Sequence, residues 1–211
     1  MDVEVDRPHT AIIGLAKLVV MEASLLVLAG GDSRRMGRPK AWLEAGSTYL
    51  LKYTADRMAP VFAEVLVSFA EPEQLEQPVP YRVVFDRKVS AGPLAGIEAG
   101  LMGARHEVVF VLACDMPYVT QALAEMAVAA ARSCDAAIPR IDGRAEPVCG
   151  AYRRSALPAI KGALDIGRYK VSEVTDFLDV TWLENLEPEQ FQSLNTPADL
   201  ERFHVEFSTQ R

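Results

Sequence analysis

The sequence has few of the side chains that build disulfide frameworks and zinc sites. Only three cysteines, Cys114, Cys134 and Cys149, occur in 211 residues, and they are far apart and form no CxxC pair. Disulfide frameworks and zinc sites depend on an even number of cysteines or on closely spaced ones. The sequence therefore indicates neither, and free cysteines favour a reducing, cytoplasmic location.

Long hydrophobic runs and an excess of basic residues are also missing. The most apolar segment, residues 11–30, is interrupted by Lys17 and Glu22, and no cleavage pattern for secretion follows it. We therefore expect no membrane span. Lys and Arg total 22 against 29 Asp and Glu, a net charge of -7. Because affinity for nucleic acid comes largely from dense Lys and Arg, this charge argues against a nucleic-acid partner.

The composition is that of a globular protein with one core. Half of the residues are apolar and 24% are charged, and no repeat or low-complexity tract is evident. This is enough material for one hydrophobic core. We expect a single domain over residues 24–207, preceded by an extension of uncertain structure over residues 1–23.

Strand and helix patterns alternate along the chain. Short apolar runs predict strands at Leu25–Ala29 and at residues 64–69, 81–86, 107–114, 136–139, 147–152 and 179–183,. Helical spacing predicts helices at residues 48–58, with Ser47 as N-cap, and at 93–104, 119–133, 153–164, 167–178 and 196–207,. The stretch 70–80 resembles a linker. Such alternation implies crossover connections, hence a mostly parallel sheet with helices on both faces.

Ligands of such sheets bind beyond the carboxyl ends of the strands, which directs attention to the loop after Leu25–Ala29. The stretch LAGGDSRRMGRPK, residues 28–40, has a net charge of +3 from Asp32 to Lys40. Its glycine spacing fits neither a Walker A loop nor a GxGxxG fingerprint. Glycine lets the backbone approach a ligand closely, so backbone N–H groups and cationic side chains in this loop are nevertheless suited to bind a polyphosphate. The alternative is a solvated basic turn.

Asp115, in the stretch CDMP, directly follows the strongest predicted strand. A carboxylate at the carboxyl edge of a sheet can hold a divalent cation that bridges phosphates. The alternative is that Asp115 caps the helix that begins near Thr120.

A third loop follows the strand at residues 81–86. Asp86 ends that strand and could accept hydrogen bonds from a ribose or a base. Gly92, Pro93 and Gly96 then form a tight turn at the start of a helix, whose positive end can face an anion or a base edge. Structural packing of a tight turn explains these small residues equally well.

Five stretches together resemble one known family. They are LAGGDSRRMGRPKA (28–41), GPLAGIEAGL (92–101), CDMPYV (114–119), EPVCGAYRRSALPAI (146–160) and NTPADLERF (195–203). In this order and spacing they resemble the molybdenum cofactor guanylyltransferases over roughly residues 25–203. The resemblance implies an α/β fold: a Rossmann-like, three-layer αβα sandwich with a mostly parallel sheet, of the nucleotidyltransferase and glycosyltransferase-A-like kind.

The family's activity is the transfer of GMP from Mg-GTP to the terminal phosphate of molybdopterin. What the resemblance implies for this chain is therefore Mg²⁺ as cofactor, GTP and molybdopterin as substrates, and partner proteins that deliver the cofactor or receive the dinucleotide. The implied nucleotide-binding residues are Leu28, Ala29, Gly30, Gly31, Lys40, Asp86, Gly92, Pro93 and Asp115, with Asn195 on the pterin side. The implied catalytic residues are Arg34, Lys40 and Asp115, the last as metal ligand.

One departure and three rival functions stay open. The family often has Asn after the second strand, where this chain has Ser68-Phe69-Ala70, which leaves nucleoside contacts there in doubt. The rivals are a molybdenum cofactor cytidylyltransferase, a sugar-phosphate nucleotidyltransferase of the same fold, and a non-catalytic module that binds a nucleotide or cofactor.

Overall fold

The computed structural model describes residues 20–30 and 38–209. Within these ranges one sheet contains the strands β1 (Met21–Leu28), β4 (Phe62–Phe69), β5 (Arg82–Phe85), β6 (Val108–Ala113), β7 (Ala136–Ile141), β8 (Arg144–Ala145), β9 (Cys149–Arg153) and β10 (Val180–Leu183). A separate hairpin joins β2 (Glu44–Ala45) to β3 (Thr48–Tyr49). The α-helices are α1 (Leu50–Met58), α2 (Pro93–Gly103), α3 (Gln121–Ala130), α4 (Leu157–Asp165), α5 (Val171–Val174) and α6 (Pro197–Thr209).

The sheet has the order β10-β7-β9-β6-β1-β4-β5, and β8 pairs with β7. β1 lies between β4 and β6 and runs parallel to both, and β4 is parallel to β5. β9 is antiparallel to β6 and β7. The predicted sheet, mostly parallel, is therefore confirmed, with β9 as an antiparallel insertion.

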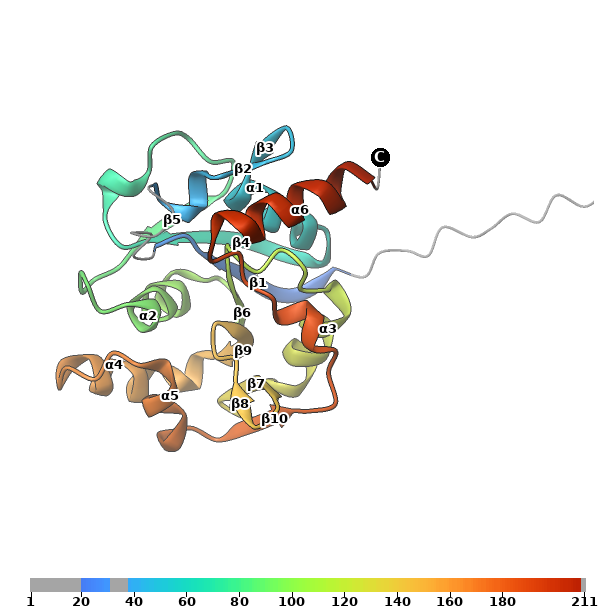
Figure 1. The fold of residues 1–211 in the computed structure, drawn as a ribbon. Helices are drawn as coiled ribbons and strands as arrows, with labels where there is room; N and C mark the ends of the chain where they lie inside the picture. Colours follow the sequence, from blue (N-terminus) through green and yellow to red (C-terminus); the bar gives the residue numbers. More distant parts are fainter. Residues whose placement is uncertain (1–19, 31–37, 210–211) are drawn as a thin grey trace, which may run out of the picture.

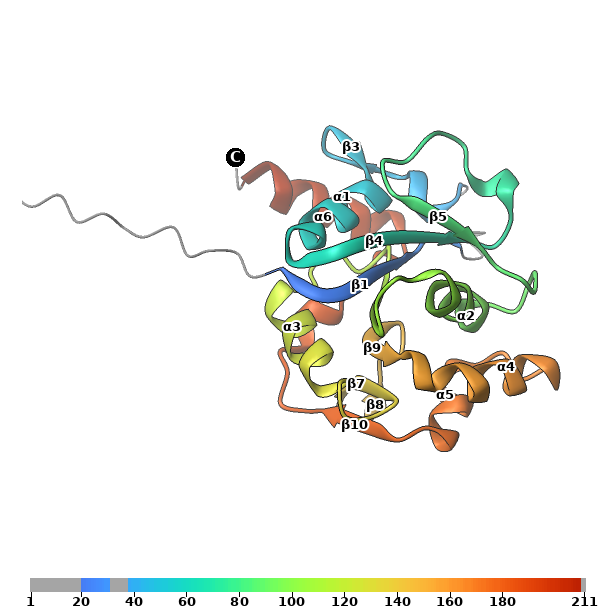
Figure 2. The same ribbon diagram turned by 180° about the vertical axis from the view of Figure 1, so that it is seen from behind.

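β1 is buried on both sides because helices cover both faces of the sheet. Leu25 and Val27 belong to a core cluster that includes residues of α1 and α3. Leu26 and Leu28 point to the other face and pack in the cluster that includes residues of α2, α4 and α5. In Figures 1 and 2, α1 lies above β1 and β4 and α2 lies below them. The three-layer arrangement predicted from the sequence is confirmed.

The first helix begins later than predicted. α1 starts at Leu50, its N-cap residue is the extended Tyr49, and no side chain caps it, so Ser47 is not the cap. Thr48 and Tyr49 pair instead with β2 in the antiparallel hairpin. Threonine and tyrosine favour strands, and this preference prevails at the start of the segment.

Two other predictions need correction in extent. β1 begins at Met21, four residues before the predicted strand. The helix predicted at residues 167–178 is only the single turn α5 followed by a 3-10 turn, Thr175–Phe177. Its β-branched residues Val171, Val174 and Thr175 lose side-chain freedom in a helix, which works against a longer one.

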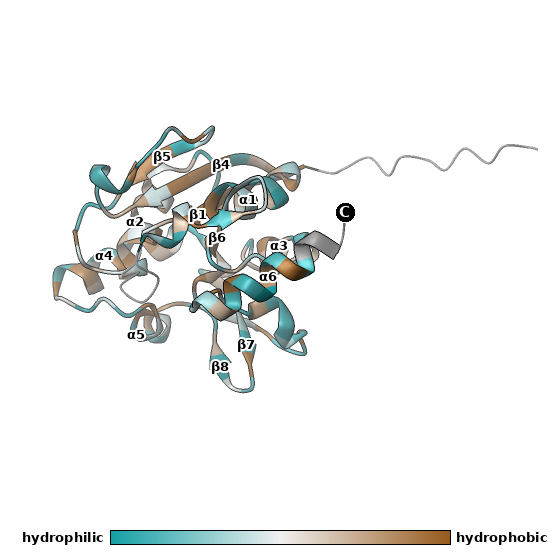
Figure 3. Cartoon of the chain, turned by 45° about the horizontal axis from the view of Figure 1, so that its top comes forward, coloured by the Kyte–Doolittle hydropathy of each residue, from teal (hydrophilic) through white to brown (hydrophobic). Residues whose placement is uncertain are grey.

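α6 packs the end of the chain against α1 and the segment before β2. Its Phe203 is buried with Leu43, Leu50 and Leu194, and its ring meets the Tyr53 ring edge-on at 5.1 Å. In Figure 3, β4 is hydrophobic along much of its length, whereas α6 carries both hydrophilic and hydrophobic segments, as a surface helix does,. No helix within the described ranges is long and apolar enough to cross a membrane.

Candidate active site

The parallel strands end together at one edge of the sheet. Backbone hydrogen bonds extend the ladders past the strand ends: Ala29 N donates to Ser68 O (2.9 Å), Asp86 N to Phe69 O (3.0 Å) and Cys114 N to Leu28 O (3.1 Å). The loops that follow β1, β4, β5 and β6 therefore leave the sheet side by side. This is the edge where the sequence predicts ligand binding.

A pocket of about 1030 Å³ opens at this edge. It is formed by the ends of β1, β4 and β5, the residues after β4, and the first turns of α2. Its lining residues are Leu28, Ala29, Gly30, Arg38, Pro39, Ser68, Phe69, Ala70, Glu71, Gln74, Asp86, Val89, Ser90, Gly92, Pro93 and Gly96. The volume is at the upper end of the range for small-molecule sites and can hold a nucleotide.

Six of the predicted binding residues line this pocket: Leu28, Ala29, Gly30, Asp86, Gly92 and Pro93. Predicted residues Gly31 and Arg34 lie outside the described residues, as do residues 1–19 of the predicted extension. The structure thus brings the described ends of the first predicted loop, residues 28–30 and 38–39, together with the third loop. The second, with Asp115, lies beside them.

Two glycines shape the wall formed by α2. Gly92 precedes the helix with φ = 65°, a backbone conformation that L side chains rarely adopt,. Gly96 allows close approach, because a Cβ atom there would lie 2.8 Å from Ser68 Oγ and 2.9 Å from Leu28 Cδ2. Both glycines therefore shape this wall of the pocket, which supports the packing explanation of the turn, and ligand binding by the turn stays a prediction.

Asp86 carries a carboxyl group in an unusual environment. Its Oδ1 atom is buried and has no hydrogen-bond partner among the described residues. Burial, and secondly the neighbouring carboxylate of Glu98, raise the pKa of Asp86 to about 7,. Glu98 is itself buried, and its Oε1 lies 3.4 Å from Arg87 Nη1. Asp86 itself lines the pocket, so its carboxyl group is a candidate acceptor for a ligand N–H or O–H donor,.

A second cluster lies where β6 ends. Lys40 Nζ donates to Asp115 Oδ2 at 2.6 Å and to Asn195 Oδ1 at 2.7 Å. The Lys40 and Asp115 side chains are 20% and 17% exposed, so the pair is largely shielded from water yet accessible to a ligand. Lys40 directly follows Arg38 and Pro39, which line the pocket. The predicted Lys40, Asp115 and Asn195 thus come together from three distant parts of the chain.

The alternative role for Asp115, as a helix cap, is wrong. Thr120 caps α3, and its side-chain oxygen accepts a hydrogen bond from Leu123 N at 3.3 Å. Asp115 instead points its carboxylate at Lys40. The N-cap of α3 is instead Thr120, the residue directly before the helix.

The residues present fit a Mg²⁺ ion that arrives with a nucleotide. No group of three or more His, Cys, Asp or Glu side chains with the spacing of a metal site occurs in the part of the chain that the structure describes. Mg²⁺, however, is usually held by one or two carboxylates together with substrate phosphates. Asp115 offers one such carboxylate at the strand end, so the donor set suits a metal bound jointly by protein and triphosphate.

The sequence patterns do not predict the part of the pocket wall that follows β4. Ala70, Glu71 and Gln74 line the pocket, although their stretch resembles a linker. Gln74 Oε1 accepts from Ala70 N at 2.9 Å, and Trp42 Nε1 donates to Gln74 O at 2.8 Å. A signal was available in the position of this stretch, because it directly follows the second parallel strand. Ser68, the first residue of the stretch Ser68-Phe69-Ala70, is buried next to Gly96.

Comparison with known proteins defines the class. The family described as MobA-like NTP transferase domain matches residues 25–184. The chain therefore belongs to this family, which confirms the class of nucleotide-transferring enzymes indicated by its motifs.

Curated relatives narrow the class. A probable molybdenum cofactor guanylyltransferase of Pelotomaculum thermopropionicum is 34% identical over 193 residues, covering 88% of this chain and 94% of that protein. One of Methanosarcina mazei is 36% identical over 197 residues, covering 84% and 88%. The resemblance drawn from the five motifs is confirmed by these relatives.

Solved structures share the fold of this chain. Molybdopterin-guanine dinucleotide biosynthesis protein A of Archaeoglobus fulgidus superimposes with a TM-score of 0.77 at 26% identity, covering 88% of this chain and 99% of that one. A 2-C-methyl-D-erythritol 4-phosphate cytidylyltransferase of Thermus thermophilus has a TM-score of 0.68 at 24% identity, covering 88% and 98%. At this lower identity the second likeness shows the shared fold alone.

Proposed function

We propose that this chain transfers GMP from GTP to the terminal phosphate of molybdopterin, forming the guanine dinucleotide cofactor and pyrophosphate. The observation that carries the proposal is the Lys40–Asp115 pair at the carboxyl edge of the sheet, next to a pocket large enough for a nucleoside. The names of the relatives supply the choice of substrates, since 30–36% identity extends over most of the chain.

In the proposed reaction, an oxygen of the terminal phosphate of molybdopterin attacks the α-phosphorus of GTP. A new P–O bond forms, the bond from the α-phosphorus to its bridging oxygen breaks, and pyrophosphate leaves with the negative charge. Such a transfer needs in-line positioning and charge stabilisation more than covalent help from the protein.

The side chains divide these tasks. Lys40 carries the positive charge that stabilises the phosphates as charge develops on the leaving group. Asp115 would hold Mg²⁺, which when bound supplies further neutralisation of phosphate charge. Asp86, which lines the pocket, accepts a hydrogen bond from the nucleoside through its carboxylate. Gly92 and Gly96 leave room for the nucleoside at the start of α2.

Two predicted roles go with this proposal and rest on sequence alone. Gly31 would hold the nucleotide through its backbone, and Arg34 would neutralise the triphosphate. Asn195 would also face the pterin side, in addition to its contact with Lys40. The partner proteins that deliver molybdopterin or accept the dinucleotide belong to the same proposal, as does action in the cytoplasm.

The test is an assay of the purified chain with GTP, Mg²⁺ and molybdopterin that measures pyrophosphate and identifies the dinucleotide by mass. We expect pyrophosphate release that requires molybdopterin and matches the dinucleotide formed. Binding of GTP without any pyrophosphate release would contradict the proposal and favour a non-catalytic binding module.

A further inference from the structure

The segment that leads into α6 closes the active-site cluster from one side. Leu194 N donates to Asp115 O at 2.8 Å, and the next residue, Asn195, accepts from Lys40 Nζ at 2.7 Å. Two consecutive residues therefore contact both members of the Lys40–Asp115 pair. Because 155 positions separate Lys40 from Asn195, this arrangement depends on where the start of α6 is fixed.

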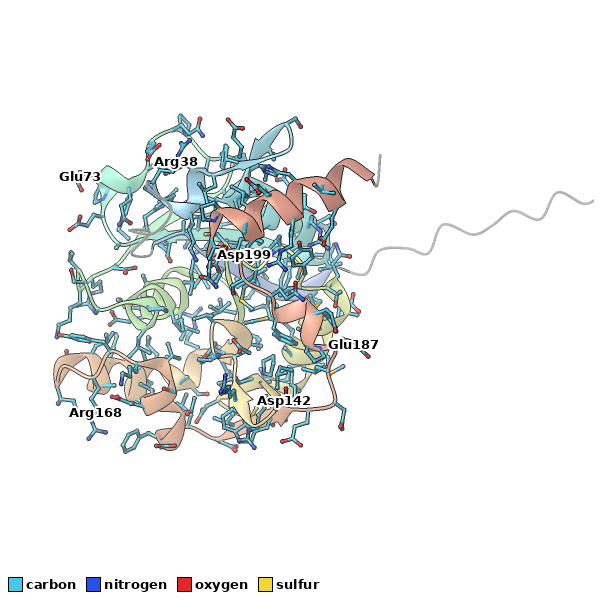
Figure 4. The ribbon with its side chains drawn as sticks, in the orientation of Figure 1. Arg38, Glu73, Asp142, Arg168, Glu187 and Asp199 are labelled. Carbon is cyan, nitrogen blue, oxygen red and sulfur yellow. The ribbon has the colours of Figure 1, made fainter. Side chains whose placement is uncertain are left out.

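Asp199 fixes that start. Its Oδ2 accepts from Asn195 N (3.1 Å), Thr196 N (2.8 Å) and Thr196 Oγ1 (2.8 Å). Asp199 N lies 3.2 Å from Thr196 Oγ1 and donates to it. This reciprocal pattern is a capping box in which aspartate replaces the usual glutamate. Figure 4 shows Asp199 at the first turn of α6, in the middle of the molecule.

The Asp199 carboxylate is charged and strongly held. Hydrogen bonds from Thr196, and then from Arg202 and Asn195, lower the pKa of Asp199 to about 2,. Its side chain is 20% exposed. One carboxylate oxygen thus gathers the donors of two residues, and one of these is the residue that contacts Lys40.

We propose that Asp199 is a positioning residue for Lys40: it holds the Asn195 backbone through its capping box, and Asn195 Oδ1 then holds the Lys40 ammonium at a fixed place beside Asp115. The consequence for catalysis rests on the role given to Lys40 under the proposed function. When the capping box is removed, Asn195 loses its anchor, and Lys40 loses the well-placed acceptor that Asn195 Oδ1 provides beside Asp115.

The test compares Asp199→Ala with Asp199→Asn, which keeps one oxygen of the same size and place. Two variants serve as matched controls. Asp135→Ala removes a carboxylate that likewise joins loop segments, accepting from Asp179 N and Ser155 Oγ, but near β7 and β9. Glu206→Gln weakens the far end of α6, where Glu206 accepts from Tyr118 Oη at 2.7 Å.

The first measurement is competitive labelling of lysines in the nucleotide-free protein, followed by peptide mass spectrometry. Asp199→Ala should expose Lys40 to faster labelling than in the wild-type protein, by more than the variation among the other lysines, and Asp199→Asn should give a smaller increase. Neither control should alter Lys40. Unchanged labelling of Lys40 in Asp199→Ala would overturn the proposal, and this result does not depend on which substrate the enzyme uses.

The second measurement is kcat/KM for GTP. Asp199→Ala should lower it by about tenfold, as expected when a reacting group is displaced slightly by a distant change. Asp199→Asn should recover part of the loss, and both controls should keep wild-type values. An equal loss in Asp135→Ala or Glu206→Gln would reduce Asp199 to a general structural role. Absence of turnover in the wild-type protein would instead refute the proposed function, whereas the labelling result would still judge the positioning.

Discussion

Two aspartates at the same edge of the sheet have opposite environments. Asp115, after β6, is bound to Lys40 at 2.6 Å. Asp86, after β5, has a buried oxygen without a described partner and faces the charge of Glu98. One carboxylate is paired with a cation, whereas burial and a neighbouring carboxylate raise the pKa of the other to about 7. This difference matches two tasks, charge control at the phosphates and recognition of the nucleoside.

The largest effect should come from breaking the paired side of this comparison. Lys40→Ala and Asp115→Asn should each lower kcat by about a thousandfold, because a group that stabilises developing charge is lost. Steady-state kinetics with GTP and molybdopterin would measure this.

The matched control is Lys52→Ala, which removes a partly exposed lysine that pairs with Asp56 one helical turn away. It should leave kcat unchanged and the unfolding free energy within about 0.5 kcal/mol of the wild-type value. Turnover like that of the wild type in Lys40→Ala or Asp115→Asn would remove the assigned role of that residue.

An intermediate effect should come from filling the pocket next to Asp86. Gly96→Ala places a Cβ against Ser68 and Leu28, both of which are buried. Overpacking of this kind costs about 1–3 kcal/mol, partly offset by the better helix propensity of alanine, about 1 kcal/mol. We expect GTP binding, measured by calorimetry, to weaken by about tenfold, equivalent to about 1.4 kcal/mol.

Gly162→Ala is the control for that substitution. Gly162 lies within α4, and an added Cβ there would meet nothing within 4 Å. It should raise the unfolding free energy by about 0.5–1 kcal/mol without changing GTP affinity. If Gly96→Ala behaves like Gly162→Ala in both measurements, the close approach at Gly96 does not shape the nucleotide site.

The smallest effect concerns the pH dependence of Asp86. Its pKa is raised to about 7 in the folded protein from an ordinary value of 3.8. The folded state therefore keeps a proton that the unfolded state has already released, so this group lowers the unfolding free energy as pH rises from about 4 to about 7. After allowance for solvent screening of a half-buried group, we expect the unfolding free energy to fall by about 1 kcal/mol over this range.

Asp86→Asn removes this titration. Urea unfolding at several pH values should show the wild-type protein losing stability relative to the variant between pH 4 and 7, with no further divergence above. GTP affinity should rise over the upper part of the same range in the wild type, since the ionised carboxylate is the better acceptor, and stay flat in the variant. Parallel stability curves for the two proteins would contradict the raised pKa.

The buried strands and the glycine turns were predictable because their signals are local. Leu25–Ala29 is an unbroken apolar run, as is typical of a strand covered on both faces,. Pro93 marks the first turn of α2, as proline does at helix starts,. From the strand ends alone, the order of elements placed Asp86 and Asp115 at one edge of the sheet.

Features that depend on distant contacts were not predictable. The antiparallel direction of β9 follows from its pairing with β6 and β7, and nothing in Cys149–Arg153 encodes it. The contact of Asn195 with Lys40 joins residues 155 positions apart. Gln74 follows the second parallel strand, which points to the ligand edge, but its hydrogen bonds with Ala70 and Trp42 arise from packing. Sequence patterns give the elements and their order, whereas such contacts arise from packing.

The most direct test of the central claim is a competition between nucleotides. The purified chain is incubated with molybdopterin, Mg²⁺ and equal concentrations of GTP and CTP. The dinucleotide products are then separated, identified and quantified by mass spectrometry. Guanylyl transfer predicts that the guanine dinucleotide is by far the main product. Equal or greater formation of the cytosine dinucleotide would contradict the account.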